Sequence, residues 1–456
     1  MAAVMSPADA VWLLGETRRN PMTISTVLWL DGPVDVDVLR ERVEERVVAR
    51  HPAFRQRIVA PRVPGGLPRW LDTDVDLDEH LSVIDLPPPG EHALLEARCS
   101  LERSTPLDPD RPRWHSTIYQ GYGRNGTAIH TRLHHSLGDG TSLMRLVLSL
   151  CDDQGPVAEP DGGRRSPARR SMARAQDLLG TLPDHLDGAG IEPSAVLGAG
   201  RELAAAARWT TRLVLPDRVE RNVFHGTPHG TKRMAWDPEG WPLDAVESAG
   251  ASANVTVNDV LLTILTTGLH RYLVARDALV DELRIMMPIS LRDPSEPLPP
   301  RFGNRIGLLP VLLPVGCVDP GEQLRRLHAQ TTRLKGSPAP VISHALLAAS
   351  ALATPRGTRW LHRANQFRST GVVTNVPGPS GPWYLTGSRV LGTVGWGGLT
   401  GGLNLTGSFI TLDERVYVGF VTDTAVVAEP DQLLGAVRGA WNDVLELLGP
   451  RSADAR

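Results

Sequence analysis

One short segment constrains the fold of this chain more than any other, because its hydrophobic pattern changes period at a pair of histidines. Residues 127–134 alternate between two faces, a period of two that predicts a β-strand. Apolar side chains then recur three and four positions apart from Leu143 to Leu150, which predicts a helix that begins near Thr141. The intervening residues 134–140, HHSLGDG, are therefore a glycine-containing loop between a strand and a helix.

The same two periods are interspersed through both halves of the chain. Because strands and helices are interspersed in both halves, we predict an α/β or α+β fold class with two domains of similar size. The expected helices are 35–50, 258–274 and 430–448. Asp35 is expected to cap the first of them, and we assign the apolar stripe of the last to the core. The expected strands are 24–30 and a half-buried hairpin at 408–422 that turns at Asp413 and Glu414.

The length of 456 residues allows two or three domains. Periodicity is lost between Asp152 and Arg174, where Pro, Gly and charged residues dominate, and a Leu- and Ala-rich helical region follows around 201–213. We predict a first domain at 1–151, a linker and crossover region at 152–215, and a second domain at 216–456.

Composition and motif content exclude several functional classes. A net charge of -3, from 48 basic and 51 acidic residues, leaves no overall positive field to attract nucleic acid. Lys232 and Lys335 are the only lysines, so a Schiff-base or phosphate-binding lysine has almost nowhere to sit. The three cysteines are far apart, and the chain lacks the G-x-S-x-G, H-E-x-x-H and G-x-x-x-x-G-K-[ST] motifs. We therefore expect no metal and no bound cofactor.

The sequence also bears on location. The N-terminus has no basic region followed by an apolar run, which argues against an export signal. The longest apolar stretch, Ile306 to Val318, is shorter than the roughly 20 residues that span a bilayer. We expect a cytoplasmic protein that is not integral to a membrane.

The loop at 134–140 carries the candidate chemistry. Adjacent residues after a strand point in opposite directions, so we expect one histidine to face solvent or a channel and the other the interior. A neutral imidazole with a pKa near 6.5 removes protons around pH 7, which suits His135 as a general base. Asp139 is expected to fix the loop through backbone hydrogen bonds or an arginine. The alternative is a pair of purely structural histidines.

These residues resemble a known family. HHSLGDG looks like the H-H-x-x-x-D-G motif of the CoA-dependent acyltransferase superfamily. Further segments resemble, in order, the bacterial wax ester synthase/acyl-CoA:diacylglycerol acyltransferase (WS/DGAT) family. They are SPADAVWL and NPMTI near the N-terminus, TPLDPDRPRW at 105–114, VNDVLLT at 257–263, PISLR at 288–292, FGNRIG at 302–307, TNVPGP at 374–379 and GGLNLTGSF at 401–409. The resemblance covers nearly the whole chain.

The resemblance implies two chloramphenicol-acetyltransferase-like domains of sheet and helix with a substrate tunnel between them. His135 would be the base, His134 would orient the loop or the substrate, and Gly138 and Gly140 would let the backbone turn sharply beside the base. Asp139 would be structural, with Arg292 as its partner and Arg305 as the second choice. Gly138, Asn258 and Asn375 are the candidate substrate-binding residues, although Asn258 and Asp259 also suit a helix cap.

Two residues depart from the family pattern. Phe409 stands where a tyrosine is expected, and Leu137-Gly138 stands where a longer apolar residue often precedes the aspartate. Neither change removes a proton-transfer group, but both bear on the shape of the tunnel and so on substrate choice.

The implied function is transfer of a long-chain acyl group from acyl-CoA to a long-chain alcohol or to diacylglycerol. The acceptor would attack directly, without a covalent acyl-enzyme, and acyl-CoA would be a co-substrate rather than a cofactor. Such substrates imply peripheral contact with a membrane or lipid droplet. One alternative is an acyltransferase that acts on a specialised metabolite, sugar or amine; a non-enzyme alternative is a lipid-binding protein on the same fold. The sequence carries no signal for oligomeric state.

Overall fold

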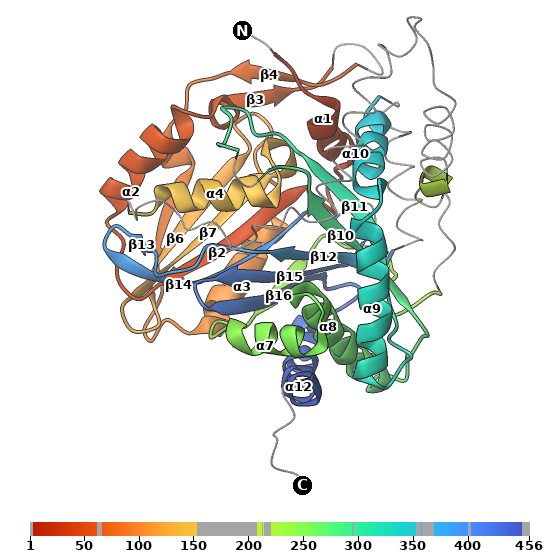
Figure 1. Ribbon diagram of the computed structural model, residues 1–456. Coiled ribbons are helices and arrows are strands. Elements are labelled where there is room, and N and C mark those ends of the chain that lie inside the picture. The colour runs from red at the N-terminus through yellow and green to blue at the C-terminus, as the bar shows by residue number, and fades with distance from the viewer. Residues whose placement is uncertain are drawn as a thin grey trace, which may run out of the picture.

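The computed structural model describes residues 3–61, 66–152, 208–211, 213, 220–293, 296–352, 357, 369–399 and 403–448. Most of the predicted linker at 152–215, including most of the expected helical region at 201–213, lies outside these residues. In the part of the chain that is described, two large mixed sheets form the framework and helices pack around them (Figure 1). The predicted fold class is confirmed.

The first sheet has six strands in the order β13-β14-β2-β7-β6-β5. These strands are β13 (Tyr384–Leu385), β14 (Ser388–Trp396), β2 (Thr23–Leu30), β7 (Gly126–His134), β6 (Trp114–Tyr122) and β5 (Leu81–Asp85). β7 is antiparallel to both β2 and β6. The predicted strands at 24–30 and 127–134 are thus confirmed, and β7 carries the histidine pair out of the middle of the sheet.

Short elements surround the first sheet. They are α1 (Pro7–Gly15), α2 (Val36–Arg42), the π-helical turn η1 (Val43–Val48), η2 (Pro52–Arg55), η3 (Leu77–Glu79), α3 (His92–Ser104) and a small sheet of β1 (Ala3–Val4), β4 (Arg69–Asp72) and β3 (Gln56–Val59). α2 begins where predicted because the Asp35 side chain accepts hydrogen bonds from the backbone N–H groups of Asp37 and Val38.

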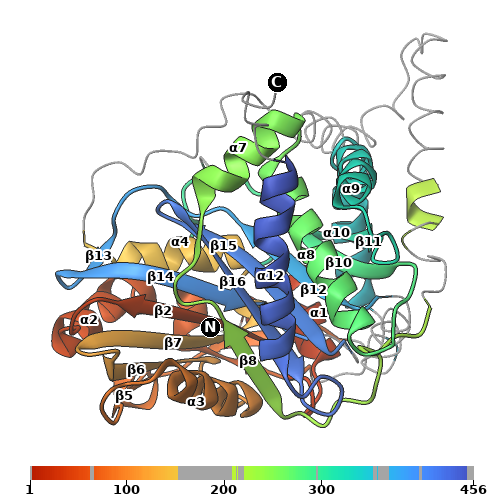
Figure 2. The same cartoon turned by 90° about the horizontal axis from the view of Figure 1, so that it is seen from below.

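The second sheet has seven strands. Six follow the order β11 (Ile306–Leu313), β10 (Leu283–Ser290), β12 (Gly371–Val376), β15 (Leu405–Leu412), β16 (Arg415–Asp423) and β8 (Lys232–Trp236), and β9 (Trp241–Pro242) pairs with β16. Helices α7 (Leu243–Ala253), α8 (Val257–Val274), α9 (Pro320–Lys335) and α12 (Pro430–Leu448) lie along this sheet (Figure 2). Helix α10 (Ala339–Ser350) packs against β11 and also against α1 of the N-terminal half.

The C-terminal helix is confirmed with the predicted bounds and the predicted buried stripe. Leu433, Val437 and Val444 are fully buried between α12 and its neighbours. The hairpin at 408–422 is confirmed as β15 and β16, with Asp413 in the left-handed region at a φ of 55°. Its burial differs from the prediction, because every residue of β16 after Arg415 is buried. Helices cover one face of the strand and the first sheet covers the other, so neither face meets solvent.

The two faces of β15 therefore pack against different layers. Leu405 and Phe409 belong to the core between the second sheet and its helices. Leu412 belongs to the core that the second sheet shares with the first. Because side chains alternate along a strand, Thr406 and Ser408 share the face of Leu412 and point toward the first sheet.

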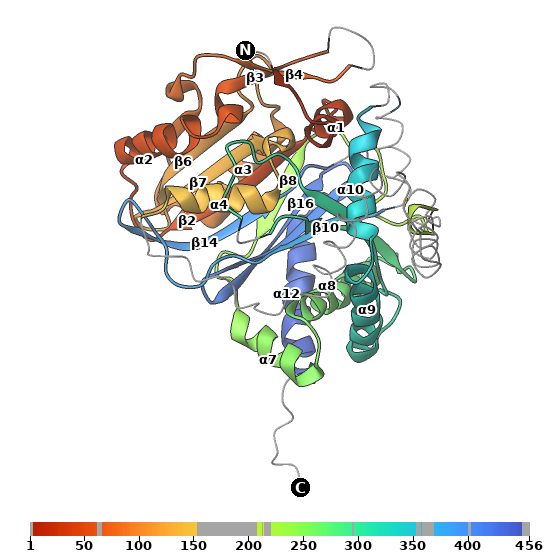
Figure 3. The ribbon, with the colours of Figure 1, turned by 45° about the horizontal axis from the view of Figure 1, so that its top comes forward.

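The domain boundaries predicted from the sequence stay a prediction, but the sheets do not divide the chain as those boundaries do. β13 and β14 come from residues 384–396, within the predicted second domain, yet they belong to the first sheet. β14 pairs antiparallel with β2, so that Thr26 lies opposite Gly395. Pairing with β14 satisfies backbone groups along an edge that β2 would otherwise leave open. The exchange joins the two halves through main-chain hydrogen bonds (Figure 3).

No helix within the described ranges is long and apolar enough to cross a membrane.

Candidate active site

The loop that leaves β7 places the two adjacent histidines in different surroundings. After β7 the chain makes one 3₁₀ turn, η4 (His135–Leu137), and then enters α4 (Gly140–Leu150), as the hydrophobic pattern predicted. Both imidazoles are buried: His134 is 1% exposed and His135 is 7% exposed. Neither histidine faces bulk solvent, because α1 and the segment around Asn304 cover the loop.

Trp12 of α1 supports the ring of His135 from one side. The two ring centroids lie 3.8 Å apart and the planes differ by 10°, which is a stacked arrangement. The backbone N–H of His135 donates to the carbonyl oxygen of Met22 at 2.7 Å. His135 is therefore held through its backbone N–H and along one face of its ring. Neither contact involves the two ring nitrogens.

Asn304 determines which nitrogen of His135 carries the proton. Its Nδ2 donates to Oδ1 of Asp9 and to the backbone carbonyl of His135, both at 2.8 Å, and these two acceptors fix the orientation of the amide. The Oδ1 of Asn304 consequently faces Nδ1 of His135 at 3.0 Å and accepts its hydrogen bond. Nδ1 carries the proton, so Nε2 carries the lone pair, as a general base requires.

Asp9 anchors Asn304 to the start of α1. Besides the amide, its carboxylate accepts the backbone N–H of Asn304 at 2.8 Å and the hydroxyl of Ser6, the helix N-cap, at 2.6 Å. Burial raises the pKa of Asp9, and the hydrogen bonds from Ser6 and Asn304 oppose that rise. Gly303 lies beside this carboxylate in the left-handed region, with φ at 52°, where an added Cβ would come 3.1 Å from an Asp9 oxygen. A side chain at position 303 would strain the backbone and crowd Asp9.

The Nε2 edge of His135 faces Gly397, just after β14. A Cβ added at Gly397 would meet Nε2 at 4.0 Å, and no other described atom beyond its chain neighbours lies within that distance. The guanidinium of the buried Arg103 holds the carbonyl of Gly397 at 2.8 Å. The position of this Cβ is therefore open, so a small group fits beside Nε2.

Burial sets the charge of His135. Desolvation lowers its pKa to about 4, and the hydrogen bond to Asn304 opposes that change only in part. The ring is neutral at pH 7, so Nε2 is able to accept a proton without first losing one.

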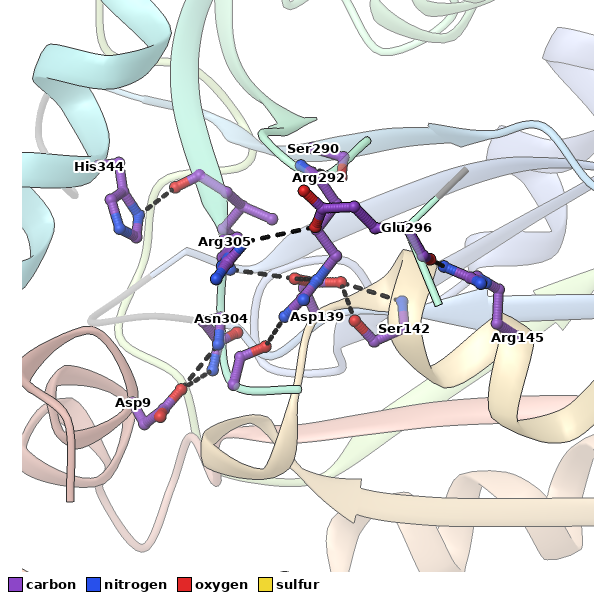
Figure 4. Close-up of polar contacts among 12 residues, drawn as sticks. Asp9, Asp139, Ser142, Arg145, Ser290, Arg292, Glu296, Asn304, Arg305 and His344 are labelled. Atoms are coloured by element: carbon purple, nitrogen blue, oxygen red, sulfur yellow. Dashed lines mark hydrogen bonds and ion pairs between the residues drawn. The ribbon is translucent and has the colours of Figure 1, made fainter. Parts of the chain in front are cut away.

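Asp139 is the junction between this loop and the second sheet. One carboxylate oxygen caps α4 by accepting the backbone N–H and hydroxyl of Ser142, at 3.0 and 2.8 Å. The other accepts Nε of Arg292 at 3.2 Å and the backbone N–H of Arg305 at 3.0 Å (Figure 4). Arg292 also donates to the carbonyl of Gly303 at 2.8 Å. The predicted pairing of Asp139 with Arg292 is confirmed.

Arg305 contributes its main chain but not its guanidinium. Its exposed side chain instead reaches Glu296 at 3.5 Å (Figure 4). Both sequence candidates therefore contact Asp139, and Arg292 is the one that supplies the charge.

His134 is turned away from His135 toward Glu16. Its Nδ1 accepts the backbone N–H of Ser136 at 3.1 Å, and its Nε2 lies 3.6 Å from a Glu16 oxygen. Burial opposes the ionisation of Glu16, but the contacts with His134 and Arg113 outweigh it and lower the Glu16 pKa to about 2. These contacts fit the predicted orienting role of His134, which stays a prediction.

The two glycines of the loop differ from the expectation that both permit a sharp turn. Gly138 has a φ of 170°, which is extended backbone open to any residue. Space restricts it instead, because an added Cβ would lie 2.8 Å from the ring of Phe302. Gly140 is the first residue of α4, and an added Cβ there would meet nothing described within 4 Å. Gly138 is needed for close packing with the 302–305 segment, whereas neither turn geometry nor space requires Gly140.

Asn258 and Asn375 contact each other on the helix-facing side of the second sheet. The Asn375 amide donates to Oδ1 of Asn258 at 3.2 Å. Asn375 lies opposite Phe409 in register, and that residue packs among the helices. No described contact joins the pair to His135. The N-cap of α8 is Thr256, which forms a capping box with Asp259. The predicted capping role is therefore confirmed for Asp259 and wrong for Asn258.

Three residues around His135 were not singled out from the sequence: Asp9, Trp12 and Asn304. All three lie within segments that carried the family resemblance, SPADAVWL and FGNRIG. That coincidence was the available signal, since the two segments lie 295 positions apart and only the fold brings them together.

The described residues contain no group of three or more His, Cys, Asp or Glu side chains that could hold a metal ion.

Two linked sheets with an H-H-x-x-x-D-G loop and an oriented neutral imidazole between them define the class of the two-domain acyltransferases and condensation domains.

Comparison with known proteins identifies the family of this chain within that class. Residues 5–261 match the wax ester synthase/diacylglycerol acyltransferase catalytic domain, and residues 302–444 match the WS/DGAT C-terminal domain. The chain belongs to the WS/DGAT family.

Relatives of known sequence and structure support this membership. A Mycobacterium tuberculosis protein named as a diacylglycerol O-acyltransferase is 30% identical over 408 residues, 85% of this chain and 87% of its own. Another from that species, tgs2, is 29% identical over 98% of this chain and 99% of its own. The wax ester synthase/diacylglycerol acyltransferase of Marinobacter aquaeolei VT8 shares the fold, with a TM-score of 0.67 and 22% identity over 98% of this chain and 100% of that one. The first condensation domain of the calcium-dependent antibiotic synthetase does too, with a TM-score of 0.62 and 17% identity over 99% of this chain and 97% of its own.

Proposed function

We propose that this protein transfers a long-chain acyl group from acyl-CoA to the hydroxyl of a long-chain alcohol or of diacylglycerol, with His135 as the general base. Membership of the WS/DGAT family supports the reaction class. The observation that carries the mechanism is the orientation of His135, whose Nδ1 is committed to Asn304 while Nε2 faces open space beside Gly397.

In the proposed reaction, Nε2 of His135 takes the proton of the acceptor hydroxyl as its oxygen attacks the thioester carbonyl carbon. The new C–O bond gives a tetrahedral intermediate whose oxygen carries the negative charge. This intermediate collapses with cleavage of the C–S bond, and the departing thiolate of CoA takes the proton from the imidazolium. The products are the ester and CoA, and His135 returns to its neutral form.

Direct attack by the acceptor fits the residues around the base. A covalent mechanism needs a Ser or Cys nucleophile within hydrogen-bond reach of the imidazole. Among the described residues, Asn304 is the side chain that hydrogen-bonds to the ring of His135. The base is therefore arranged to act on a hydroxyl that the substrate brings.

Asp139, Arg292 and His134 are proposed to support the base without touching the substrates. Asp139 ties the end of the loop to the second sheet through Arg292, and His134 ties its start to Glu16. Asn258 and Asn375 remain proposed substrate contacts on the basis of the family resemblance. Their present partners are each other, so substrate would reach them from the helix side of β12.

We also propose that the protein works at a lipid surface, because its proposed acceptors partition into membranes and lipid droplets rather than water. Flotation of the purified protein with vesicles that contain diacylglycerol tests this directly. Recovery of the protein in the lipid-free fraction would contradict it.

The reaction is tested by release of CoA thiol from palmitoyl-CoA with hexadecanol, with diacylglycerol, or with no acceptor. We expect acceptor-dependent release that falls by about 10² to 10⁴ in His135→Ala, the usual contribution of a general base. Release that is independent of acceptor, or that persists in folded His135→Ala, would contradict the mechanism. Absence of release with both acceptors from protein that binds palmitoyl-CoA would favour a specialised metabolite, sugar or amine as acceptor.

A further inference from the structure

One buried cation near the proposed base has no carboxylate partner among the described residues. Arg103 lies in the last turn of α3 and is 2% exposed. Burial and the neighbouring Arg132 lower the pKa of its guanidinium to about 9. Two other buried arginines have a carboxylate nearby, Arg292 at 3.2 Å from Asp139 and Arg132 at 3.9 Å from Glu102. Because a buried charge without a counter-ion is costly, contacts of another kind must hold Arg103 in place.

The guanidinium of Arg103 binds uncharged oxygen atoms instead. Its Nη1 donates to the carbonyl oxygen of Thr23 and, at 3.2 Å, to the hydroxyl of Ser25. Its Nη2 donates to the carbonyl oxygen of Gly397 at 2.8 Å. Thr23 and Ser25 lie at the start of β2, and Gly397 follows directly after β14. One planar group therefore joins two strands that come from opposite halves of the chain.

These contacts lie where the pairing of β2 with β14 stops. Trp396, the last residue of β14 that pairs, lies opposite Ser25. Continued pairing would place Gly397 opposite Ile24. The guanidinium of Arg103 bridges the two strands at this point in place of a further main-chain pair. The chain therefore leaves the sheet at Gly397 with its carbonyl held toward α3.

Both of the bridged segments border His135. The carbonyl oxygen of Met22, the residue just before β2, accepts the backbone N–H of His135 at 2.7 Å. Gly397 borders the ring at Nε2, where an added Cβ would lie at 4.0 Å. Arg103 therefore sets the spacing between a segment that holds the backbone of His135 and a segment that adjoins its ring.

The carbonyl of Gly397 matters because a neutral imidazole has two tautomers. Asn304 stabilises the tautomer with the proton on Nδ1. A free carbonyl oxygen beside Nε2 would stabilise the other tautomer by accepting a hydrogen bond from Nε2–H, and in that form Nε2 cannot take a proton from an acceptor. Arg103 already donates to this oxygen, so the carbonyl is turned toward the guanidinium and does not compete with Asn304.

We propose that Arg103 is a positioning residue of the active site, which holds the carbonyl of Gly397 so that the space beside Nε2 stays open and His135 stays in its basic tautomer. The inference rests on the proposed function, because it assigns a task relative to the proposed base. Arg103 does not touch the substrates and acts through the main chain of Gly397. A guanidinium suits this task, since its two amino groups donate in fixed and different directions.

The test compares Arg103→Met and Arg103→Lys with wild-type protein. Methionine removes the donors and the charge but keeps a long side chain, whereas lysine keeps the charge on a compact ammonium that does not reproduce the planar fork. Arg132→Met is the matched control. Arg132 is also buried, but it holds the carbonyls of Glu102 and Thr105, at 2.7 and 2.9 Å, and neither of these residues contacts His135.

The first measurement is the tautomer of His135 at pH 7, followed by ¹⁵N NMR of histidine-labelled protein without substrates. The resonances of His135 are identified by their absence from the spectrum of His135→Gln. We expect the proton on Nδ1 in wild-type protein and in Arg132→Met, and a mixture of both tautomers in Arg103→Met. Arg103→Lys should lie between them. A loss of stability by itself would not change this signal in folded protein.

The second measurement is kcat/KM for hexadecanol, in variants whose fold is established by circular dichroism. We expect a fall of about 10- to 100-fold in Arg103→Met, because a displaced Gly397 misaligns the acceptor, and partial recovery in Arg103→Lys. Arg132→Met should stay within about threefold of wild type. If Arg103→Met does not fold, Arg103→Lys carries the same comparison.

Two results would overturn the role of Arg103. One is a folded Arg103→Met variant that keeps the proton on Nδ1 of His135 and a kcat/KM within twofold of wild type. The other is the same change of tautomer in Arg132→Met, which would show that the effect is not specific. If the wild-type protein releases no CoA, the proposed reaction fails, and the tautomer measurement alone decides whether Arg103 positions His135.

Discussion

Replacement of Asn304 by alanine tests the assignment of His135 most directly, because Asn304 is the residue that sets its tautomer. The substitution removes the acceptor of the His135 Nδ1 proton and the two amide donations to Asp9 and to the His135 carbonyl. The backbone N–H of residue 304 remains bonded to Asp9, as does the hydroxyl of Ser6, so the carboxylate is not left without donors.

The size of the effect follows from the charge that the ring acquires during catalysis. When Nε2 takes the acceptor proton, the bond from Nδ1 to Asn304 becomes a hydrogen bond from a cation, which contributes about 1.5–3 kcal/mol. At about 1.36 kcal/mol per factor of ten, its loss lowers kcat/KM by about 10- to 150-fold. This loss stays below the one expected for His135→Ala, because the base itself remains. The substitution also removes two hydrogen bonds between neutral groups and one to the Asp9 carboxylate, which together cost about 2.5–6 kcal/mol of folding free energy.

The assay is CoA thiol release at saturating acceptor, with thermal unfolding followed by circular dichroism to establish that the variant is folded. The pH dependence adds a second readout. The bond to Asn304 raises the pKa of His135 against the effect of burial, so its removal should shift the acidic limb of the profile to lower pH. Asp9→Asn is the matched control, since an amide at position 9 can still accept from Asn304 and donate to Ser6. A folded Asn304→Ala variant with kcat/KM within twofold of wild type would refute the tautomer argument.

Three further predictions concern His135 and the residues around its loop. Gly397→Ala should fold normally but lose about 10²-fold or more in kcat/KM. The added methyl group would lie 4.0 Å from Nε2 of His135 and occupy the space of the acceptor oxygen. Normal turnover together with normal unfolding would contradict this prediction. Arg292→Ala should lose about 3–5 kcal/mol of stability, measured by urea unfolding, because it leaves Asp139 buried without its cation. Arg292→Lys should recover only part of this stability, because a compact ammonium does not reproduce the planar guanidinium whose Nε and Nη2 donate to Asp139 and to the Gly303 carbonyl. A well-folded but inactive Arg292→Ala would count against the structural role. The wild-type kcat/KM should stay level from pH 7 to about pH 5 and halve near pH 4. The reason is that His135 must be neutral to accept a proton, and its pKa is lowered to about 4. A midpoint near the ordinary histidine pKa of about 6.5 would show that the ring is solvated during turnover.

Local patterns predicted the elements of the site well. The change of period at His134 located the end of β7 and the start of α4 to within a residue or so, because both signals depend only on neighbours along the chain. The pairing of Asp139 with Arg292 was predictable for a different reason. A buried carboxylate needs a donor of opposite charge, and the chain has almost no cations other than arginine.

Predictions that required knowledge of a neighbouring layer were less successful. β16 alternates in sequence like a strand with one wet face, yet the first sheet covers that face. Residues 384–396 belong to the second half by position and to the first sheet by pairing, because β2 offered an open edge. The glycine at position 138 was assigned to a turn, whereas its function is to admit the ring of Phe302.

Local patterns were enough to predict the fold class, the family and the position of the proposed base. These follow from hydrophobic period, residue chemistry and a motif whose members lie within seven consecutive positions, 134–140. The orientation of the proposed base depends instead on tertiary contacts. Asp9 and Asn304 meet across 295 positions of chain, and it is their contact that commits one nitrogen of His135 and frees the other. A hydrogen bond between distant segments depends on how the two halves pack, and no local pattern encodes that packing.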